Sequence, residues 1–395
     1  MPDATLRDRA RGLLTPSGRS NVPPFMVMDV MAAAARIEAA GGHVIHMEVG
    51  QPAASAPKAA ISAARAALDS GRIDYTSALG IASLRQRIAR HYHETYRCAV
   101  DANRIVVTTG SSGGFILAIL ALFEPGDRVA VTVPGYPPYR HILTALGCEP
   151  VLIETSNETR HALTGEALLA AHREKPLQGV LVGSPANPTG TMMSREALAG
   201  LMTAAESAGI RFISDEIYHG LDYAFPAVTA AELSPHALVV NSFSKYFCMT
   251  GWRIGWMVVP ESLVRPIERL QQNLSISVPT LSQIAAEAAF EGAAEMEAIK
   301  RGYQENRRIL IEGLPRAGLT DFLPADGAFY LYADVSKFTS NSFAFASEML
   351  EKAHVAVTPG IDFDPVHGHA FIRLSYARSA DEMRQAVARI TAWLT

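Results

Sequence analysis

Three charged residues in the second half of the chain have types and surroundings suited to chemistry. Lys245 lies in NSFSKYFCMTGWRIGW (residues 241–256), after a predicted strand and among hydroxyl, aromatic and methionine side chains. Arg253 follows eight residues later, and Arg373 interrupts the apolar stretch FIRLSYA. A lysine partly withdrawn from water has a lowered pKa, and Schiff-base chemistry requires its neutral amine. Because a guanidinium group binds a carboxylate bidentately, Arg373 either pairs with a protein carboxylate or receives one from a ligand.

Further polar groups follow other predicted strands. Asp215 ends a strand, and Tyr218 lies three residues on, which is the same face if this segment is helical. Gly110-Ser111-Ser112 joins a strand to a helix, where free N–H groups and the helix dipole suit a phosphate. Ligands of open α/β sheets bind at the carboxyl ends of strands, so these groups should meet there. The strand-end set comprises Ser111, Ser112, Tyr136, Asn187, Asp215, Tyr218, Ser242 and Lys245.

Each of these groups also has a structural explanation when taken alone. Asp215 is a common helix N-cap type, and Tyr218 would be an ordinary buried tyrosine. The NPTG sequence at 187–190 is typical of a turn, and Lys245 of a solvent-exposed position. Together, however, the set predicts a cofactor with a phosphate, an aromatic ring, a basic ring nitrogen and an aldehyde. That description fits pyridoxal 5′-phosphate.

The surrounding sequence predicts the elements that position these groups. From about residue 104, short runs rich in Val and Ile alternate with helical segments, which is typical of a mostly parallel sheet covered on both faces. GWRIGWMVV indicates a further strand, with an antiparallel direction as one option, and HVIHMEVGQP a short strand that ends at Gly50. The predicted class is therefore α/β. We expect a large domain over residues 50–285 and a smaller α+β domain from residues 1–49 and 286–395.

Composition excludes several classes of protein. The chain has 395 residues, of which 49% are hydrophobic and 19% charged, as expected of a globular rather than a disordered chain. A net charge of −4 argues against a nucleic-acid surface. Neither a secretion signal in MPDATLRDRARGLL nor an apolar run of about 20 residues is found. Three scattered cysteines indicate reduced thiols and a cytoplasmic location.

Two histidine pairs, HYH at 91–93 and HGH at 367–369, raise the question of a metal site. No cysteine or carboxylate cluster accompanies them at ligand spacing, and HYH is predicted on a surface helix. We therefore expect no metal.

In order along the chain, these motifs resemble those of the class I and II pyridoxal-phosphate aminotransferases of fold type I. The resemblance rests on NPTG, SDEIY, SFSK followed by GWRIGW, and IRLSY, and it extends from VGQP near residue 50 through YTSALGIASLRQRIA, EPGD and PGYPPY to Arg373. It implies transfer of an amino group between an L-amino acid and a 2-oxo acid by a ping-pong mechanism. It also implies a homodimer with shared active sites.

The resemblance further implies a role for each matching residue. Lys245 resembles the Schiff-base lysine, and Asp215 the carboxylate that keeps the pyridine nitrogen protonated. The backbone of Gly50, with Asn187 and Arg373, would bind the substrate α-carboxylate. The other cofactor contacts would be Tyr218 and Asn187 to the ring oxygen, Tyr136 to the ring face, and Ser111, Ser112, Ser242, Arg253 and the neighbouring subunit's Tyr75 to the phosphate.

One departure from the family pattern bears on the substrate. Some aspartate-acting bacterial relatives carry a lysine at the position of Ser112, where it can meet a side-chain carboxylate. Ser112 cannot supply that charge, so neutral or apolar amino donors are expected. Two other functions stay open: a β-eliminating carbon–sulfur lyase on the same fold, and a pyridoxal-phosphate-sensing regulator. The regulator would carry a DNA-binding winged helix ahead of the matching region, which begins by about residue 20.

Overall fold

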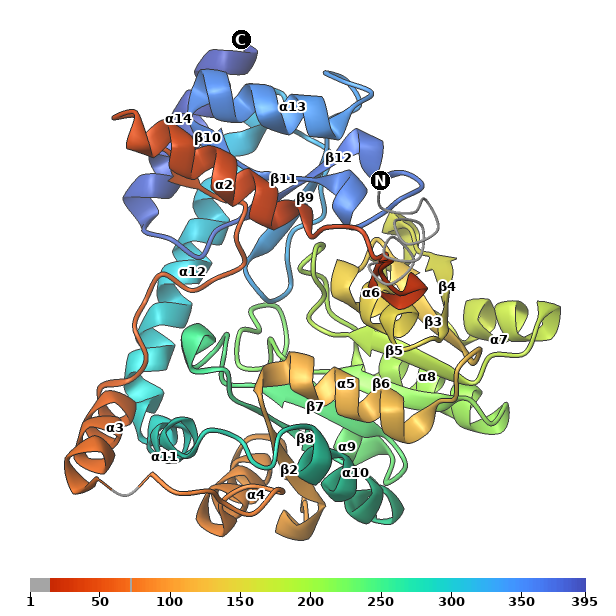
Figure 1. The fold of residues 1–395 in the computed structure, drawn as a ribbon. Coiled ribbons are helices and arrows are strands. Elements are labelled where there is room, and N and C mark those ends of the chain that lie inside the picture. Colours follow the sequence, from red (N-terminus) through yellow and green to blue (C-terminus); the bar gives the residue numbers. More distant parts are fainter. Residues whose placement is uncertain (1–14, 72) are drawn as a thin grey trace, which may run out of the picture.

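The computed structural model describes residues 15–71 and 73–395 (Figure 1). The stretch MPDATLRDRARGLL, which belongs to the predicted N-terminal part of the small domain, lies outside the described residues. The helices are α2 (Met26–Ala39), α3 (Lys58–Ser70), α4 (Ala82–Tyr96), α5 (Gly110–Leu122), α6 (Pro137–Ala145), α7 (Gly165–Glu174), α8 (Arg195–Ser207), α9 (Ala230–Leu233), α10 (Glu261–Leu274), α11 (Thr280–Ala289), α12 (Ala293–Gly313), α13 (Ser342–Glu348) and α14 (Ala380–Leu394). The strands are β1 (Ile45–His46), β2 (Ile105–Thr108), β3 (Arg128–Val133), β4 (Glu149–Glu154), β5 (Gly179–Gly183), β6 (Arg211–Asp215), β7 (Leu238–Ser242), β8 (Gly255–Val258), β9 (Tyr330–Asp334), β10 (Val355–Ala356), β11 (Thr358–Pro359) and β12 (Phe371–Ser375).

Seven strands form the central sheet in the order β2-β8-β7-β6-β5-β3-β4. Strands β3 to β7 pair in parallel, whereas β8 runs antiparallel to both of its neighbours, β2 and β7. The α/β class with a mostly parallel sheet is confirmed, and so is the antiparallel option for GWRIGWMVV.

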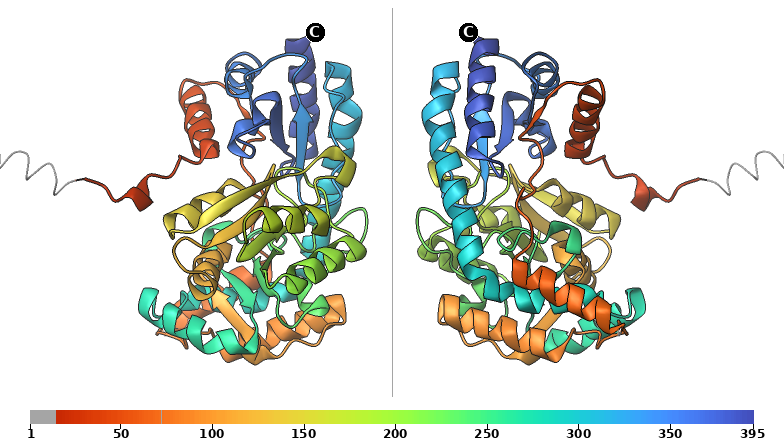
Figure 2. Two further views of the ribbon diagram at one scale, coloured as in Figure 1. Left: turned by 90° about the vertical axis from the view of Figure 1, so that its right-hand side faces the viewer. Right: turned by 90° about the vertical axis from the view of Figure 1, so that its left-hand side faces the viewer.

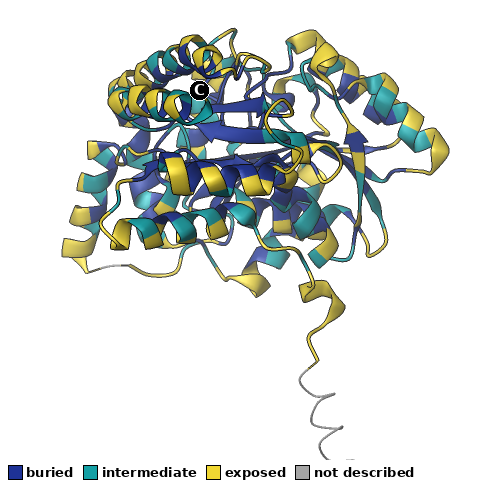
Figure 3. Ribbon diagram, turned by 90° about the horizontal axis from the view of Figure 1, so that it is seen from above, coloured by how far each residue is buried: buried dark blue, intermediate teal, exposed yellow. Residues whose placement is uncertain are grey.

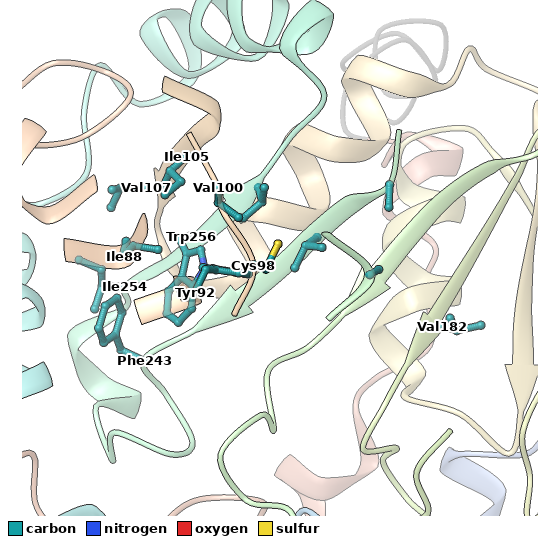
Figure 4. Packing of buried hydrophobic residues seen from close by; sticks show 14 of the residues in the cluster. Ile88, Tyr92, Cys98, Val100, Ile105, Val107, Val182, Phe243, Ile254 and Trp256 are labelled. Carbon is teal, nitrogen blue, oxygen red and sulfur yellow. The ribbon is translucent and has the colours of Figure 1, made fainter. Parts of the chain in front are cut away.

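Both faces of this sheet are buried at its inner strands, and in β2 every residue is buried. In β2, Ile105 and Val107 enter the core formed with α3 and α4, whereas Val106 enters the core formed with α5. Figure 3 shows the buried strands between helices whose outer sides are exposed. In the first core, Tyr92 and Trp256 lie together (Figure 4), and the indole N–H of Trp256 donates to the Tyr92 hydroxyl at 3.2 Å. HYH lies on α4, a helix with one exposed face as predicted: His93 is exposed, whereas Tyr92 points inward and is fully buried.

A second group of elements packs around its own apolar core. Strands β11, β12 and β9 form an antiparallel sheet, and β1 pairs in parallel with β10. Helices α12 and α14 cover this core, and α12 runs from it towards α11 and α3 (Figures 1 and 2). The domain limits at residues 50 and 285 stay a prediction. Within the described ranges, no helix has both the length and the apolar character needed to cross a bilayer.

β1 is shorter than the strand that the sequence predicts to end at Gly50. Beyond His46, the carbonyl of Glu48 accepts hydrogen bonds from the side chains of Arg373 and Thr358. The carbonyl of Gly50 accepts one from Lys245. Met47 still bonds the backbones of Ala356 and Ser375, so the backbone leaves its neighbouring strands only from Glu48 on, where these carbonyl groups accept from side chains.

Candidate active site

A cavity of about 240 Å³ lies where the carboxyl ends of the central strands face the second group of elements. Ten of the twelve residues singled out from the sequence line it, namely Gly50, Ser111, Ser112, Tyr136, Asn187, Asp215, Tyr218, Lys245, Arg253 and Arg373. Ser242 and Tyr75 do not. The strand-end set, apart from Ser242, is thus brought together around one space.

Lys245 places an amine at the centre of this cavity. Its Nζ donates to the carbonyl of Gly50 at 2.6 Å and lies 5.9 Å from the centre of the Tyr218 ring. Burial lowers the pKa of Lys245 to about 8, and the positive charges of Arg373 and Arg253 add to this effect. The amine is therefore closer to its neutral form than an exposed lysine would be.

Gly50 has no room for a side chain. A Cβ on this residue would lie 1.9 Å from the hydroxyl oxygen of Tyr330. That hydroxyl in turn shares a hydrogen bond of 2.8 Å with the hydroxyl of Tyr218. Tyr330, on β9, lines the cavity and was missed in the sequence, where GAFYLYADV shows only an apolar strand.

Asp215 is the last residue of β6, and its carboxyl group is buried in the cavity wall. It accepts hydrogen bonds from the Tyr139 hydroxyl and from the backbone N–H of Ile217, at 3.0 Å for the latter. Burial raises the pKa of Asp215 to about 6, while the bond from Tyr139 acts in the opposite direction. Tyr139 was also missed, although PGYPPY places it three residues after Tyr136 at the start of a helix.

The start of α5 forms a cradle for an anion. Thr109 precedes the helix and gives it no side-chain cap, so the first N–H groups are left for another acceptor. Gly110 has a φ of +67°, and a Cβ there would lie 2.6 Å from a guanidinium nitrogen of Arg253. The surrounding hydroxyl groups in the cavity wall belong to Ser111, Ser112, Ser244 and Thr250.

Ser242 lies behind this cradle rather than in it. Its hydroxyl donates to the carbonyl of Ile254, 3.0 Å away, and its oxygen shares a hydrogen bond of 2.8 Å with the hydroxyl of Ser244. Ser244, two residues further along SFSK, lines the cavity instead. A direct contact of Ser242 with a phosphate stays a prediction.

Arg373 presents its guanidinium group from the opposite wall, on β12. The group lies between the rings of Tyr330 and Phe363, at 4.5 and 4.7 Å from their centres. It donates to the Asn187 side-chain oxygen at 3.0 Å and to the Thr358 hydroxyl at 3.1 Å. Its Nε is buried and has no acceptor among the described residues. The group is fixed in place, and two of its five N–H donors, on Nε and Nη1, have no acceptor among the described residues, which suits a ligand carboxylate.

Tyr75 lies apart from the cavity of its own chain and is 80% exposed. Its neighbour Thr76 donates a backbone hydrogen bond to the hydroxyl of Ser277 at 3.4 Å, so this segment lies beside the end of α10. The role of Tyr75 in a neighbouring subunit stays a prediction.

The donor set of the cavity suits pyridoxal phosphate. It offers a cationic, hydroxyl-rich cradle at the start of α5, a buried carboxylate at the end of β6 and an amine between them. These match a phosphate, a basic ring nitrogen and an aldehyde in turn. Among residues 15–71 and 73–395, no group of three or more His, Cys, Asp or Glu side chains could hold a metal ion.

Comparison with known proteins gives matches along almost the whole chain. The family described as aminotransferase class I and II matches residues 42–390. The valine–pyruvate aminotransferase of Mycobacterium tuberculosis is 48% identical and covers 95% of this chain and 97% of its own. The crystal structure of an aminotransferase from Mycobacterium tuberculosis has a TM-score of 0.94 at 47% identity, covering 96% and 99% of the two chains. The aspartate aminotransferase from Thermus thermophilus with maleate has a TM-score of 0.87 at 30% identity, covering 99% and 100%.

Proposed function

The chain belongs to the class I and II aminotransferases, and we propose that it moves the amino group of a neutral, aliphatic L-amino acid to a small 2-oxo acid such as pyruvate. Amino-group transfer is the activity of this family, whose members use pyridoxal phosphate. The observation that carries the proposal is the amine of Lys245, with the carboxylate of Asp215 and the guanidinium group of Arg373 around the same cavity.

Residues on the sheet side hold the cofactor in this proposal. When bound, pyridoxal phosphate supplies an aldehyde for the amino group and a ring that accepts the electrons of the breaking Cα–H bond. Asp215 would accept a hydrogen bond from the ring nitrogen, and Tyr136 would face the ring. Tyr218 and Asn187 would bond the ring oxygen. The phosphate would be held by Ser111, Ser112, Ser244, Arg253 and the start of α5, with Ser242 positioning Ser244.

Lys245 moves the proton. Its lowered pKa brings the amine near neutral pH, where a general base is most effective. The amine takes the proton from Cα of the amino donor. In the second half of the transfer it gives a proton to Cα of the 2-oxo acid. Arg373 and Asn187 bind the α-carboxylate and thereby turn the Cα–H bond towards Lys245.

The charges of the cavity favour a neutral donor. Of its described lining residues, three carry positive charge: Lys245, Arg253 and Arg373. The proposal uses all three, for the aldehyde, the phosphate and the α-carboxylate, which leaves no cation of this chain for an acidic side chain. The remaining wall includes the apolar residues Phe25, Val27 and Met28 from the start of α2. The greater identity to the valine–pyruvate enzyme than to the aspartate enzyme points the same way.

A homodimer and a cytoplasmic location are part of the proposal. Tyr75 and the nearby Leu274 and Ile276 are exposed, at 80%, 59% and 51%, so this surface offers apolar area to a second copy. The cysteines at 98, 148 and 248 are free and buried, as suits a reducing compartment.

A donor screen tests the proposal. Twenty amino donors would be assayed against pyruvate, 2-oxoglutarate and oxaloacetate, and valine with pyruvate should be among the fastest pairs. The absorbance of the purified holoenzyme near the visible edge should shift when valine is added, and borohydride followed by peptide mapping should find the reduced adduct at Lys245. Release of pyruvate and ammonia from cystathionine without an acceptor would instead favour the carbon–sulfur lyase. An aspartate preference would overturn the proposed donor class.

A further inference from the structure

We infer that Asp362 is a positioning residue that holds the start of α2 over the cavity and so sets the preference for branched over small donor side chains. Asp362 lies on the turn after β11, outside the cavity lining. The inference rests on the proposed function, since it concerns how aliphatic donors are distinguished.

The start of α2 has no cap from its own sequence. The first N–H groups of a helix need an acceptor from outside the helix. Phe25 occupies the N-cap position and has no side-chain oxygen to accept these hydrogen bonds. Val27 is 3% exposed, so water has little access to this residue. The carboxyl group of Asp362, 2% exposed, lies beside the backbone N–H groups of Met26 and Val27, and both groups act to lower its pKa. The acceptor placed at this helix start therefore belongs to a residue more than 300 positions away in the chain.

The turn that carries Asp362 is itself tied to both sides of the cavity. Arg140 on α6 donates to the backbone carbonyl of Asp362. The N–H of Gly135, next to Tyr136, donates to the carbonyl of Phe363 at 3.1 Å. The ring of Phe363 in turn lies against the guanidinium group of Arg373. The anchor for α2 is therefore fixed relative to the ring-facing tyrosine and the carboxylate-binding arginine.

The buried carboxyl group of Asp362 does not serve stability well. Burial raises its pKa to about 6, although Arg373 and Arg140 oppose the shift, and its Oδ2 has no partner among the described residues. A carboxyl group whose folded pKa lies above the unfolded value makes folding less favourable as the pH rises through that interval. A residue held at such a cost is better explained by the position that it gives α2 than by the stability that it adds.

The position of α2 decides what the donor side chain meets. Phe25, Val27 and Met28 line the cavity within the first turn of the helix or just before it. Figure 1 shows α2 lying along β10 and β11, so its apolar start extends past the small sheet to the cavity. Releasing that end would weaken contacts with a branched side chain. Alanine, whose methyl group reaches less far, would lose little.

Asp362→Ala tests the inference in the holoenzyme. We expect kcat/KM for valine to fall at least about tenfold through KM, and that for alanine by no more than about twofold. Asp362→Asn, which keeps an acceptor oxygen, should retain most of the valine preference. The matched control is Asn341→Ala, which removes the side-chain cap that Ala344 uses at 3.1 Å on α13, away from the cavity. It should leave the valine-to-alanine ratio unchanged.

Amide hydrogen exchange of the peptide around residues 25–31 gives an independent readout. Exchange should rise at least about tenfold in Asp362→Ala and stay unchanged in Asn341→Ala. If Asp362→Ala does not fold, Asp362→Ser decides in the same assays, with an expected loss of about threefold for valine. An unchanged ratio, an equal loss for both donors, or an asparagine variant as impaired as the alanine variant would overturn the inference. Loss of cofactor binding or of all transamination by the unaltered enzyme would contradict the proposed function instead.

Discussion

The two walls of the cavity are built in different ways. On the cofactor-facing wall, Ser111, Asp215 and Lys245 lie within three residues of the ends of β2, β6 and β7, which belong to one sheet. On the donor-facing wall, Val27, Tyr330 and Arg373 come from α2, β9 and β12. The backbone hydrogen bonds of a single sheet fix the first group, whereas the second depends on how separate elements pack together.

This difference assigns the two parts of the function to different physical causes. In the proposed function, a rigid sheet edge fixes the groups that would hold a cofactor and move a proton. The choice of amino donor would depend on the small sheet and on α2, which a few side-chain contacts hold in place. Changes on the first wall should therefore affect every donor alike, and changes on the second should affect some donors more than others.

Lys245→Ala breaks the cofactor-facing wall most severely. Removing both the covalent attachment point and the general base should lower kcat by at least about 10⁴-fold for every donor. Steady-state rates with valine and alanine measure this loss, and the adduct at position 245 should vanish after borohydride treatment. Lys352→Ala, on the exposed end of the small region, is the control and should keep its activity. If Lys245→Ala retained a tenth of the kcat of the unaltered enzyme, the proposed role of this amine as general base would be wrong.

Arg373→Ala breaks the donor-facing wall. Loss of a buried, bidentate partner for the α-carboxylate should lower kcat/KM by about 10²- to 10³-fold, mostly through KM. Cofactor content should stay close to normal, because the groups assigned to the ring and the phosphate lie on the other wall. Absorbance of the bound cofactor, measured beside the rates, checks this separation. Equal loss of cofactor and activity would show that the two walls do not act independently.

The sequence predicts the cofactor-facing wall better than the donor-facing wall for the same reason. A strand-end residue is positioned by its neighbours in the chain, so Asp215 and Lys245 could be recognised from local runs such as RFISDE and ALVVNSF. Nothing in the nearby sequence marks Met28 and Tyr330 as cavity residues. Apolar helices and strands have the same sequence pattern whether they pack in a core or line a cavity. Asp362 is less visible still, since its partner is a helix more than 300 residues earlier. The antiparallel direction of β8 was one of two options because pairing is also a long-range property.

Tyr139→Phe sharpens the comparison on the cofactor-facing wall. The Tyr139 hydroxyl donates to Asp215 and favours its ionised form, so its loss should raise the pKa of this carboxyl group further. A hydrogen bond to a charged group contributes about 1.5–3 kcal/mol, which corresponds to about one to two pKa units. The acidic limb of the pH–rate profile should therefore move to higher pH by about one unit, equally for valine and alanine.

Tyr96→Phe is the matched control for this change. Tyr96 also shares a hydrogen bond, with His219 at 2.9 Å, but it does not line the cavity. Its variant should leave the acidic limb where it is. Two results would contradict the hydrogen bond that Tyr139 donates to Asp215. One is a pH–rate profile of Tyr139→Phe that moved to lower pH, and the other is a profile that moved for only one of the two amino acids.

Met28→Ala tests the donor-facing wall with the smallest expected effect. Met28 lines the cavity yet is 57% exposed, so a substrate side chain can cover part of it. Loss of that contact should cost about 1 kcal/mol, or about fivefold in kcat/KM for valine, and almost nothing for alanine. Leu68→Ala, equally exposed at 54% on α3, controls for the loss of surface apolar area. In the Asp362→Ala background the same change should add little, because α2 would already have withdrawn from the donor. Full additivity of the two changes would mean that Met28 reaches the donor without the anchor at Asp362, and that the donor-facing wall is as rigid as the sheet edge opposite.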